Sequence, residues 1–495
     1  MLKMAKTNKK FYVTTSIPYV NADPHIGFAL EAIQADVLAR YHRLRGEDVF
    51  FLTGTDEHGV KVVRAAEAVG KTPKEFVDEI SGKFKALKKT LILSWDDFIR
   101  TSDQKRHWPG AQELWLKLYD AGKLYKKPYR GLYCVGHEAF ITEKDLIDGK
   151  CRDHQKEPEV IEEENWFFKL SDYSNDIKSK IESGELKIVP EGRKNEILSL
   201  INEGLEDVSF SRPIKDLSWG IPVPNDPEHT MYVWCDALSN YISALGYGST
   251  QNVDISKFQK YWPADVHMIG KDILRFHAAI WPGMLLAAGL PLPKTIFVHG
   301  FITVGGEKMS KTIGNVINPV EIVNKYGVDA LRYYLLWDIT PTGDGDFTYE
   351  KFEERYNSGL ANGIGNLVAR IAKLGETISP IVYSESDIID NNRNTKDYVC
   401  EQYDKFIGDI KFNEALGEAF VLVYSTDNYI NETKPWTLKG NDLKKVIINA
   451  SFLIQALSEL IEPFLPETAE KIRKQIKFVG DKIEIKKGDN IFPRK

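Results

Sequence analysis

Cysteine is scarce in this sequence, with four residues among 495. So few thiols cannot make a disulfide framework, so we expect a reducing, cytoplasmic setting. No run of apolar residues is long enough to cross a bilayer, and we expect no membrane association. The basic N-terminus, MLKMAKTNKK, lacks the apolar stretch and small-residue cleavage site of a signal peptide. The sequence therefore excludes the secreted disulfide-rich and membrane-spanning classes.

A strong charge of one sign is also lacking, because the formal net charge is only −6. This value argues against a protein that coats nucleic acid indiscriminately, but it leaves room for a specific RNA partner on a local basic face. Internal repeats and low-complexity tracts are absent as well. A chain of 495 residues, 43% of them hydrophobic, is too long for one core, so we expect two to four domains.

A strand–helix–strand pattern opens the chain. Residues 11–17, FYVTTSI, are typical of a buried strand, and residues 48–54, DVFFLTG, of a second. Between them, apolar residues follow helical spacing from Gly27, and Gly46 closes the helix as a left-handed cap. Such a βαβ unit predicts a parallel sheet, whose ligands bind beyond the carboxyl ends of the strands.

The pattern changes twice further along. From about 123 to 212, charge runs and clustered Cys and His replace it, which indicates an insertion in the sheet domain. Strand patterns return at Thr230 (TMYVWCDAL), Asp265 and Thr295, and a helix with Asn318 as N-cap follows. After about Asp346 the apolar spacing predicts helices almost throughout, with DNNRNTKD (390–397) as a loop inside a bundle.

The first chemical motif is the turn before the early helix. In IPYVNADPHIG, the helix that follows directs its unpaired N–H groups and its dipole towards the turn, which favours phosphate. Gly27 has no side chain, so a base or ribose can approach the backbone closely. His25 can donate a hydrogen bond to a phosphate oxygen. Alone, a histidine and glycine at a turn are more often structural.

The second motif is a glycine-flanked loop, VGGEKMSKTIGN (304–315). It carries Lys308 and Lys311, two cations that can follow the charge developing on a leaving pyrophosphate as the loop closes. Lysines on such a loop are usually solvated. The histidine turn at one end of the sheet and this loop at the other are together far more specific than either alone.

The inserted segment contains two C-x-x-H pairs. Cys134 and His137 form the first, Cys151 and His154 the second. Four such ligands suit a tetrahedral zinc site, and closed coordination would make it structural. Single pairs of this kind are often accidental, whereas a double pair rarely is. The other two thiols, Cys235 and Cys400, stand alone, and we interpret them as structural.

With these motifs the sequence resembles the class I aminoacyl-tRNA synthetases, and further stretches resemble the methionyl-tRNA synthetases among them. These stretches are IPYVNADPHIG, TGTDEHG, YVWCDAL, IGKDILRFHAAIWP and FITVGGEKMSKTIGN. The resemblance extends from about Phe11 to beyond Trp436. One position departs from it: the family's first signature ends in a second histidine, and here that residue is Phe28.

The resemblance implies ATP-dependent activation of L-methionine, with Mg²⁺ accompanying ATP, and transfer of the methionyl group to the terminal ribose of tRNA(Met). It assigns His25, Lys308 and Lys311 to stabilisation of the transition state. The implied ATP-binding residues are His25, Gly27, Lys308, Met309, Ser310 and Lys311. With no appended dimerisation module in view, we expect a monomer.

The resemblance also implies two binding sites for other groups. Asp56 would hold the ammonium of methionine and Arg212 would lie near the site. The remaining pocket residues are Ile17, Tyr19, Trp234, Ala237, Tyr241, His277 and Trp281. In the helical region, Asn366, Arg370 and Trp436 would read the CAU anticodon, since amide, guanidinium and indole suit hydrogen bonding and stacking with unpaired bases.

The expected fold is therefore α/β: a Rossmann-type parallel-sheet catalytic domain, an inserted connective domain with a zinc knuckle, and a C-terminal all-α anticodon-binding bundle. Its expected parts are 1–122 and 213–300 for the two halves of the sheet domain, 123–212 for the connective domain, 301–347 for the lysine loop and stem-contact region, and 348–495 for the bundle. The family's knuckle is commonly richer in cysteine, which leaves zinc occupancy open.

Three other functions are compatible with part of the pattern. A synthetase for isoleucine, leucine or valine usually carries a much longer editing insertion than the one expected here. A catalytically silent tRNA-binding paralogue should have lost His25 or the loop lysines, and the sequence keeps them. A simple nucleotidylyltransferase of the same superfamily would not need a long helical domain.

Overall fold

The computed structural model describes residues 7–136, 139–141, 143–152, 155–249, 255–309 and 314–495. A six-stranded sheet with all neighbouring strands parallel lies at its centre, so the expected Rossmann-type sheet is confirmed. The order is β3 (Asp97–Arg100), β2 (Asp48–Thr55), β1 (Lys10–Thr15), β14 (Val266–Gly270), β15 (Thr295–His299) and β9 (Lys187–Val189). The order reverses between β1 and β14, where open α/β sheets bind their ligands.

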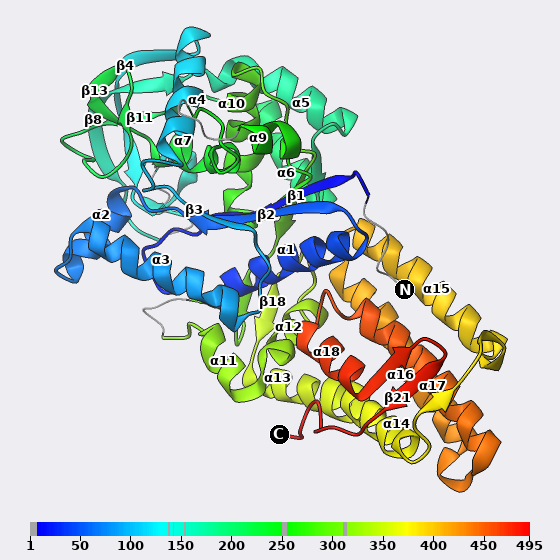
Figure 1. Cartoon of the computed structure of the whole chain (residues 1–495). Helices are drawn as coiled ribbons and strands as arrows, with labels where there is room; N and C mark the ends of the chain where they lie inside the picture. Colours follow the sequence, from blue (N-terminus) through cyan, green and yellow to red (C-terminus); the bar gives the residue numbers. More distant parts are fainter. Residues whose placement is uncertain (1–6, 137–138, 142, 153–154, 250–254, 310–313) are drawn as a thin grey trace.

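Alternate residues of the strands contribute their side chains to two hydrophobic cores, one on each face of the sheet. On β1, Phe11 and Val13 belong to one apolar cluster and Tyr12 to the other. Helices α1 (Ile26–Leu44) and α3 (Pro73–Thr90) cover the first face. Helices α4 (Trp108–Asp120) and α10 (Trp281–Ala287) cover the second (Figure 1).

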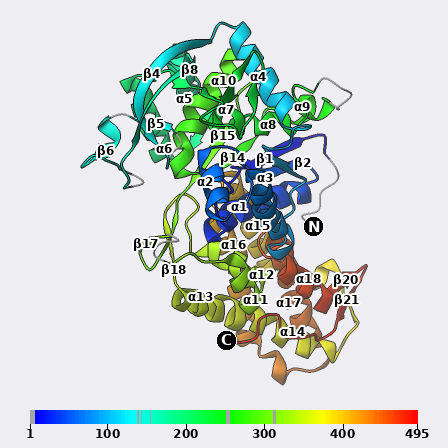
Figure 2. The same cartoon turned by 90° about the vertical axis from the view of Figure 1, so that its left-hand side faces the viewer.

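The segment 123–212 contains an antiparallel sheet that lies beyond the second face (Figure 2). Its order is β10 (Val208–Ser209), β8 (Glu159–Phe168), β4 (Leu124–Cys134) and β5 (Ala139–Ile141). Helices α5 (Ser174–Ser183) and α6 (Glu191–Glu203) follow β8. The same segment also supplies β9, which pairs with β15 at the edge of the parallel sheet. The boundaries of the domains remain a prediction.

A small sheet and two helices link the parallel sheet to the helical region. The sheet order is β17 (Glu307–Lys308), β16 (Ile302–Val304) and β18 (Gly345–Phe347). Asn318 caps the next helix as expected, because its side chain accepts a hydrogen bond from the Val320 N–H. The helix is divided by Gly327, whose φ is +89°, into α11 (Pro319–Tyr326) and α12 (Val328–Trp337).

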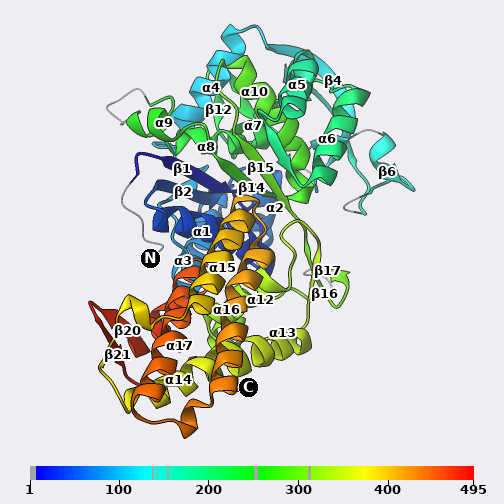
Figure 3. The same cartoon turned by 90° about the vertical axis from the view of Figure 1, so that its right-hand side faces the viewer.

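The C-terminal part is helical, as expected (Figure 3). Its main helices are α13 (Tyr349–Arg355), α14 (Asn366–Glu376), α15 (Asp390–Gly408), α16 (Phe412–Thr433), α17 (Gly440–Leu460) and α18 (Pro466–Gln475). The all-α expectation is wrong in detail, because β19 (Ile381–Val382), β21 (Lys482–Ile485) and β20 (Ile476–Val479) form a sheet. These strands are short, and they bury isoleucines against the bundle. Within the described ranges, no helix has the length and apolarity needed to span a membrane.

Two local predictions were wrong for physical reasons. Residues 390–397, expected as a loop, form the first turns of α15. Their side chains are all polar, Asn392 being the one that is buried, and the apolar stripe of Val399, Tyr403 and Ile407 begins only beyond them. In TMYVWCDAL, β13 (Asp226–Met231) ends early and α7 (Val233–Leu238) takes over. A short apolar run does not by itself distinguish a strand from a buried helix.

Candidate active site

The histidine turn caps helix α1 at the carboxyl end of the parallel sheet. His25 is the N-cap residue, and its Nδ1 accepts a hydrogen bond from the Gly27 N–H at 3.0 Å. Burial lowers the pKa of His25, so the imidazole is neutral near pH 7. Because Nδ1 is the acceptor, the proton is on Nε2, which is the tautomer that can donate to a phosphate oxygen.

The lysine loop folds against this turn. A Cβ added to Gly27 would lie 3.8 Å from Cε of Met309, and the Ile26 N–H donates to the Ile317 carbonyl at 3.0 Å. The ammonium of Lys308 lies 5.3 Å from the centre of the Phe301 ring. Ser310 and Lys311 lie outside the described residues. The two motifs, far apart in sequence, therefore meet in space.

Phe28, at the position of the family's second histidine, turns away from the site. It is 8% exposed and makes an edge-to-face contact with Phe84 of α3, with ring centres 5.0 Å apart. Its side chain belongs to the core under the sheet and has no group that could bind phosphate.

Tyr19 and Asp56 are joined where β1 and β2 end. The Val20 N–H donates to the Asp56 carbonyl at 3.1 Å, and the Asp56 N–H donates to the Pro18 carbonyl at 2.9 Å. Asp56 is buried, whereas Tyr19 and Ile17 are partly buried against the core of the second face. A carboxylate at this edge can bind an ammonium group.

A cluster of aromatic side chains lies nearby on the second face. Burial lowers the pKa of His277 to about 4, so its ring is neutral. Its Nδ1–H donates to the Ile273 carbonyl at 3.0 Å, and its Nε2 therefore accepts from the Tyr241 hydroxyl at 2.8 Å. Trp281 lies 6.0 Å from the Tyr241 ring, and Trp234 meets His277 edge-on at 6.2 Å.

Trp234 also stacks on Phe276, with ring centres 3.7 Å apart, and Ala237 is buried on the same short helix, α7. The structure thus brings four of the expected pocket residues into one cluster: Trp234, Tyr241, His277 and Trp281. An uncharged aromatic cluster with a polarisable face suits a thioether side chain.

Arg212 has its contacts within the inserted segment. Its guanidinium makes a two-pronged ion pair with Glu163, at 2.6 and 2.8 Å, and lies 4.5 Å from the Tyr133 ring centre. Arg212 is almost fully buried. The pair fixes this arginine between β11 (Ser211–Pro213) and β8.

A buried polar chain supports the edge of the sheet, and sequence reasoning missed it. Asp236 accepts from His58 Nδ1 at 2.6 Å and from His107 Nε2 at 2.7 Å, while His107 Nδ1 lies 2.8 Å from the Ser243 hydroxyl. Burial raises the pKa of Asp236, but the two imidazoles outweigh it and hold the value below the usual range. Asp236 stands within YVWCDAL, between Trp234 and Ala237, so the chain anchors the helix that carries both.

A second missed group lies beside the histidine turn. Glu31 of α1 accepts from the Ser16 hydroxyl and backbone N–H, both at 2.7 Å, and from His299 Nε2 at 2.8 Å. Burial lowers the pKa of His299, but the pairing with Glu31 outweighs it and raises the value overall. A carboxylate one helical turn after Gly27 was a usable signal in the sequence.

Comparison with known proteins decides the family. A family model described as tRNA synthetases class I (M) matches residues 11–157 and 142–372. The methionine–tRNA ligase of Caldanaerobacter subterraneus subsp. tengcongensis is 43% identical over 98% of this chain and 79% of its own length. That of Brucella suis biovar 1 is 42% identical over 96% of this chain and 93% of its own.

The chain belongs to the class I methionyl-tRNA synthetases.

Solved structures agree with this assignment. The Mycobacterium tuberculosis methionyl-tRNA synthetase in complex with methionyl-adenylate is 35% identical, with a TM-score of 0.90 over 98% of this chain and 100% of that chain. As a member of this family, the chain is a methionine–tRNA ligase, and the readings as an isoleucine, leucine or valine enzyme or as a silent paralogue are not favoured.

In the synthetase's inserted segment, the two C-x-x-H cysteines come together. Cys134 at the end of β4 and Cys151 of β7 (Lys150–Cys151) are buried in one small cluster with Ile141. His137 and His154 lie outside the described residues. Among the residues that are described, no three His, Cys, Asp or Glu side chains form a group that could hold a metal ion.

In the synthetase's helical region, Arg370 and Trp436 meet although they are far apart in sequence. The guanidinium lies 5.8 Å from the indole centre and is held by Asp427 at 2.6 Å and by Asn431 at 2.9 Å. Trp436 is 54% exposed, which is unusual for so large an apolar ring, and Asn366 is exposed at the start of α14. Together they present stacking and hydrogen-bonding groups to solvent.

Proposed function

We propose that the ligation reaction takes place where the lysine loop meets the histidine turn. The substrate is ATP with its Mg²⁺, bound with the α-phosphate at the N-terminus of α1. The carboxylate of methionine attacks the α-phosphorus in line, the bond to the bridging oxygen breaks, and pyrophosphate leaves. His25 Nε2–H, Lys308 and Lys311 stabilise the charge that develops on the phosphates.

The observation that supports this proposal is the packing of Met309 on Gly27, 3.8 Å from the position of an added Cβ. It places Met309, the residue after Lys308, beside the turn at which the triphosphate would bind. The flanking Ser310 would then bind the same nucleotide. In the second step, a 2′-hydroxyl of the terminal tRNA ribose attacks the acyl carbon and AMP leaves.

For methionine, we propose that Asp56 holds the ammonium group while the aromatic cluster holds the side chain. Ile17 and Tyr19 close the pocket from the end of β1, and Trp234, Ala237, Tyr241, His277 and Trp281 form its wall. Arg212, fixed by Glu163, contributes from the inserted segment. The neutral His277 supports an apolar ligand, because an imidazolium would favour a charged one.

Exchange of labelled pyrophosphate into ATP tests these roles directly. Exchange should require methionine and should be absent with isoleucine, leucine or valine. The Lys311→Ala variant should slow exchange about 100-fold with little change in the KM for methionine, since its contact strengthens in the transition state. Exchange driven by isoleucine, or an unaltered Lys311→Ala rate, would contradict the proposal.

For tRNA(Met), we propose that Asn366, Arg370 and Trp436 bind the anticodon. The support is the meeting of a guanidinium and an exposed indole on one surface. The Trp436→Ala variant should lose charging of intact tRNA while keeping methionine-dependent exchange. Equal charging by the variant and the parent would refute this site.

For the inserted segment, we propose one structural Zn²⁺ held by Cys134, His137, Cys151 and His154. The support is the burial of the two thiols in a single small cluster, where a bound metal would replace a larger apolar core. Metal analysis of the purified protein should find zinc near one per chain, and its absence would refute the knuckle. We also propose that the protein is cytoplasmic and that it is a monomer. Size-exclusion chromatography with light scattering tests the oligomeric state.

A further inference from the structure

A fully buried arginine joins the helical region to the catalytic helix. Arg332 of α12 is 0% exposed, and its guanidinium has partners on three other segments. Nε donates to the Phe464 carbonyl at 2.7 Å, and Nη2 donates to the Pro463 carbonyl at 2.8 Å. These two carbonyls belong to the corner between α17 and α18. Nη1 donates to the Leu91 carbonyl at 3.2 Å.

The remaining partner is on α1, the helix that begins at the histidine turn. Nη2 of Arg332 also donates to Oδ2 of Asp36, at 2.8 Å, and Asp36 is 0% exposed. The other oxygen of Asp36 accepts from the Ser94 N–H at 2.7 Å and hydroxyl at 2.6 Å. Asp36 follows His25 by eleven residues, so about 16 Å of straight helix separates them.

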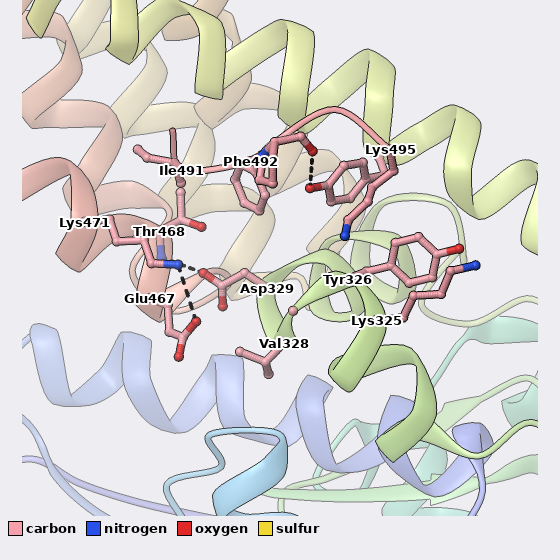
Figure 4. Close-up of a pocket in the computed structure, with 13 residues that line it drawn as sticks. Lys325, Tyr326, Val328, Asp329, Glu467, Thr468, Lys471, Ile491, Phe492 and Lys495 are labelled. Atoms are coloured by element: carbon pink, nitrogen blue, oxygen red, sulfur yellow. Dashed lines mark hydrogen bonds and ion pairs between the residues drawn. The ribbon is translucent and has the colours of Figure 1, made fainter. Parts of the chain in front are cut away.

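A second contact on the same helix strengthens this junction. Asp329, one turn before Arg332, accepts from the Thr468 N–H in the first turn of α18 at 2.6 Å. Both residues line the same small cavity (Figure 4). Helix α12 therefore holds both the corner before α18 and the start of α18, and it holds α1 with the same guanidinium.

The buried ion pair at this junction fixes the relative orientation of the segments and adds little to their stability. Buried ion pairs add little stability compared with apolar side chains of similar size, but their hydrogen bonds have fixed directions. A planar guanidinium with four such bonds permits one relative placement of α1 and the α17–α18 corner. Apolar residues of the same corner, Ile461 and Leu465, are buried in the large core and already stabilise it.

We propose that Arg332 is a positioning residue for the ligation reaction. It ties the helical region that bears Arg370 and Trp436 to α1, so that binding of the anticodon adjusts the histidine turn for transfer of the methionyl group. This inference rests on the proposed anticodon site, and the experiment below separates the two.

The test compares an intact tRNA(Met) with an acceptor-stem minihelix that has no anticodon. The ratio of their kcat/KM values measures the advantage given by the anticodon. The Arg332→Lys variant keeps the positive charge but loses the planar guanidinium with its several N–H donors. In this variant the ratio should fall at least tenfold. Methionine-dependent exchange and minihelix charging, which do not involve the anticodon, should change less than threefold.

The Arg40→Lys variant is the matched control. Arg40 lies one turn after Asp36 and donates to the same oxygen at 2.7 Å, but its other partner is the Ile92 carbonyl and not the helical region. It should keep the ratio of the parent enzyme. If Arg332→Lys does not fold, Asp36→Asn carries the test, because it weakens the junction from the side of α1 and should reduce the ratio in the same way.

A merely structural role predicts a different result. Charging of both substrates would then fall in parallel, the ratio would stay constant, and the proposal would be overturned. If the parent enzyme itself shows no advantage for intact tRNA, the anticodon site is refuted, and this inference with it. If the parent enzyme prefers intact tRNA and the Arg332→Lys and Asp36→Asn variants keep the same ratio, only the role of Arg332 is refuted.

Discussion

Two histidines of the candidate active site are neutral, and each is held in one tautomer by its hydrogen bonds. His25 accepts at Nδ1 from a backbone N–H and so has its proton on Nε2. His277 donates at Nδ1 to a carbonyl and so accepts at Nε2 from Tyr241. The first can therefore donate to an anion, whereas the second has both nitrogens occupied within an apolar pocket.

The hydroxyl of Tyr241 can be tested alone. Tyr241→Phe leaves a buried imidazole nitrogen unsatisfied, which should disturb the wall of the proposed methionine pocket. We expect the KM for methionine in the exchange reaction to rise about tenfold, equivalent to about 1.4 kcal/mol, with kcat nearly unchanged.

Tyr247→Phe is the control, because the Tyr247 hydroxyl is buried and makes no hydrogen bond within the part of the chain that the structure describes. Its removal should leave the KM unchanged. Equal effects of the two variants would mean that the Tyr241–His277 hydrogen bond does not shape the pocket.

At the scale of elements, helix α1 begins at the proposed catalytic histidine and also joins other parts of the fold. Its first turn holds the histidine, and its middle holds Asp36 and thereby Arg332. Its last turns contact α15, where the Tyr41 hydroxyl donates to Asp404 at 3.1 Å. Changes in its N-terminal turn should therefore alter catalysis while leaving the rest of the helix in place.

Gly27→Ala should separate activity from stability. The added Cβ would lie 2.8 Å from His25 Cε1, so the imidazole must shift from the capping position. We expect pyrophosphate exchange to fall at least tenfold. Alanine favours helix by up to about 1 kcal/mol over glycine, so the melting temperature should not fall in proportion to the activity.

Gly82→Ala provides the comparison, since Gly82 lies in helix α3 and a Cβ there meets nothing within 4 Å. It should raise the melting temperature slightly and leave exchange unchanged. A fully active Gly27→Ala enzyme would show that the position of His25 at the turn is unimportant.

At the scale of the whole molecule, Asp329 makes stability depend on pH at the junction of the two halves. Burial raises the pKa of Asp329 to about 6, against the opposing hydrogen bonds from Thr468. Because the folded form holds this proton more tightly than the unfolded form, the contribution of Asp329 to stability is greatest below pH 4. It declines as the pH rises from about 4 to about 6, by about 3 kcal/mol at most.

Asp329→Asn should remove this dependence while keeping an oxygen that can accept from the Thr468 N–H. Urea unfolding of both proteins at several pH values between 4.5 and 7 measures the difference. The gap between them should move in favour of the variant as the pH rises. A constant gap would show that Asp329 does not titrate in this range.

The sequence predicted the parts of this molecule that depend on local pattern. The strands beginning near Phe11, Asp48 and Thr295 are apolar and β-branched, and the structure has them. The helical structure of residues 390–397 was not predicted, because a polar stretch can equally be a loop or the exposed start of a helix. The strands β19 to β21 escaped because they are two to four residues long.

The site followed the same division. The histidine turn and lysine loop are short motifs, so they could be found from sequence, whereas the link from His58 through Asp236 to His107 joins residues 129 and 178 positions apart. Likewise, nothing local distinguishes Arg332 from a surface cation on an amphipathic helix. Such groups acquire their roles only when the chain has folded.

The apolar cluster beneath the sheet continues from Phe11 through Tyr333 and Leu416 to Phe492 near the C-terminus. Within the described residues, the first face of the sheet and the helical region therefore share one core, and a cut between them would expose apolar surface on both pieces. If the chain were cleaved after the parallel sheet, each fragment would expose a large apolar surface and would aggregate. On heating, the parallel sheet and the helical region should unfold in one cooperative transition. A destabilising substitution in the helical region would therefore also abolish activity at the distant catalytic site.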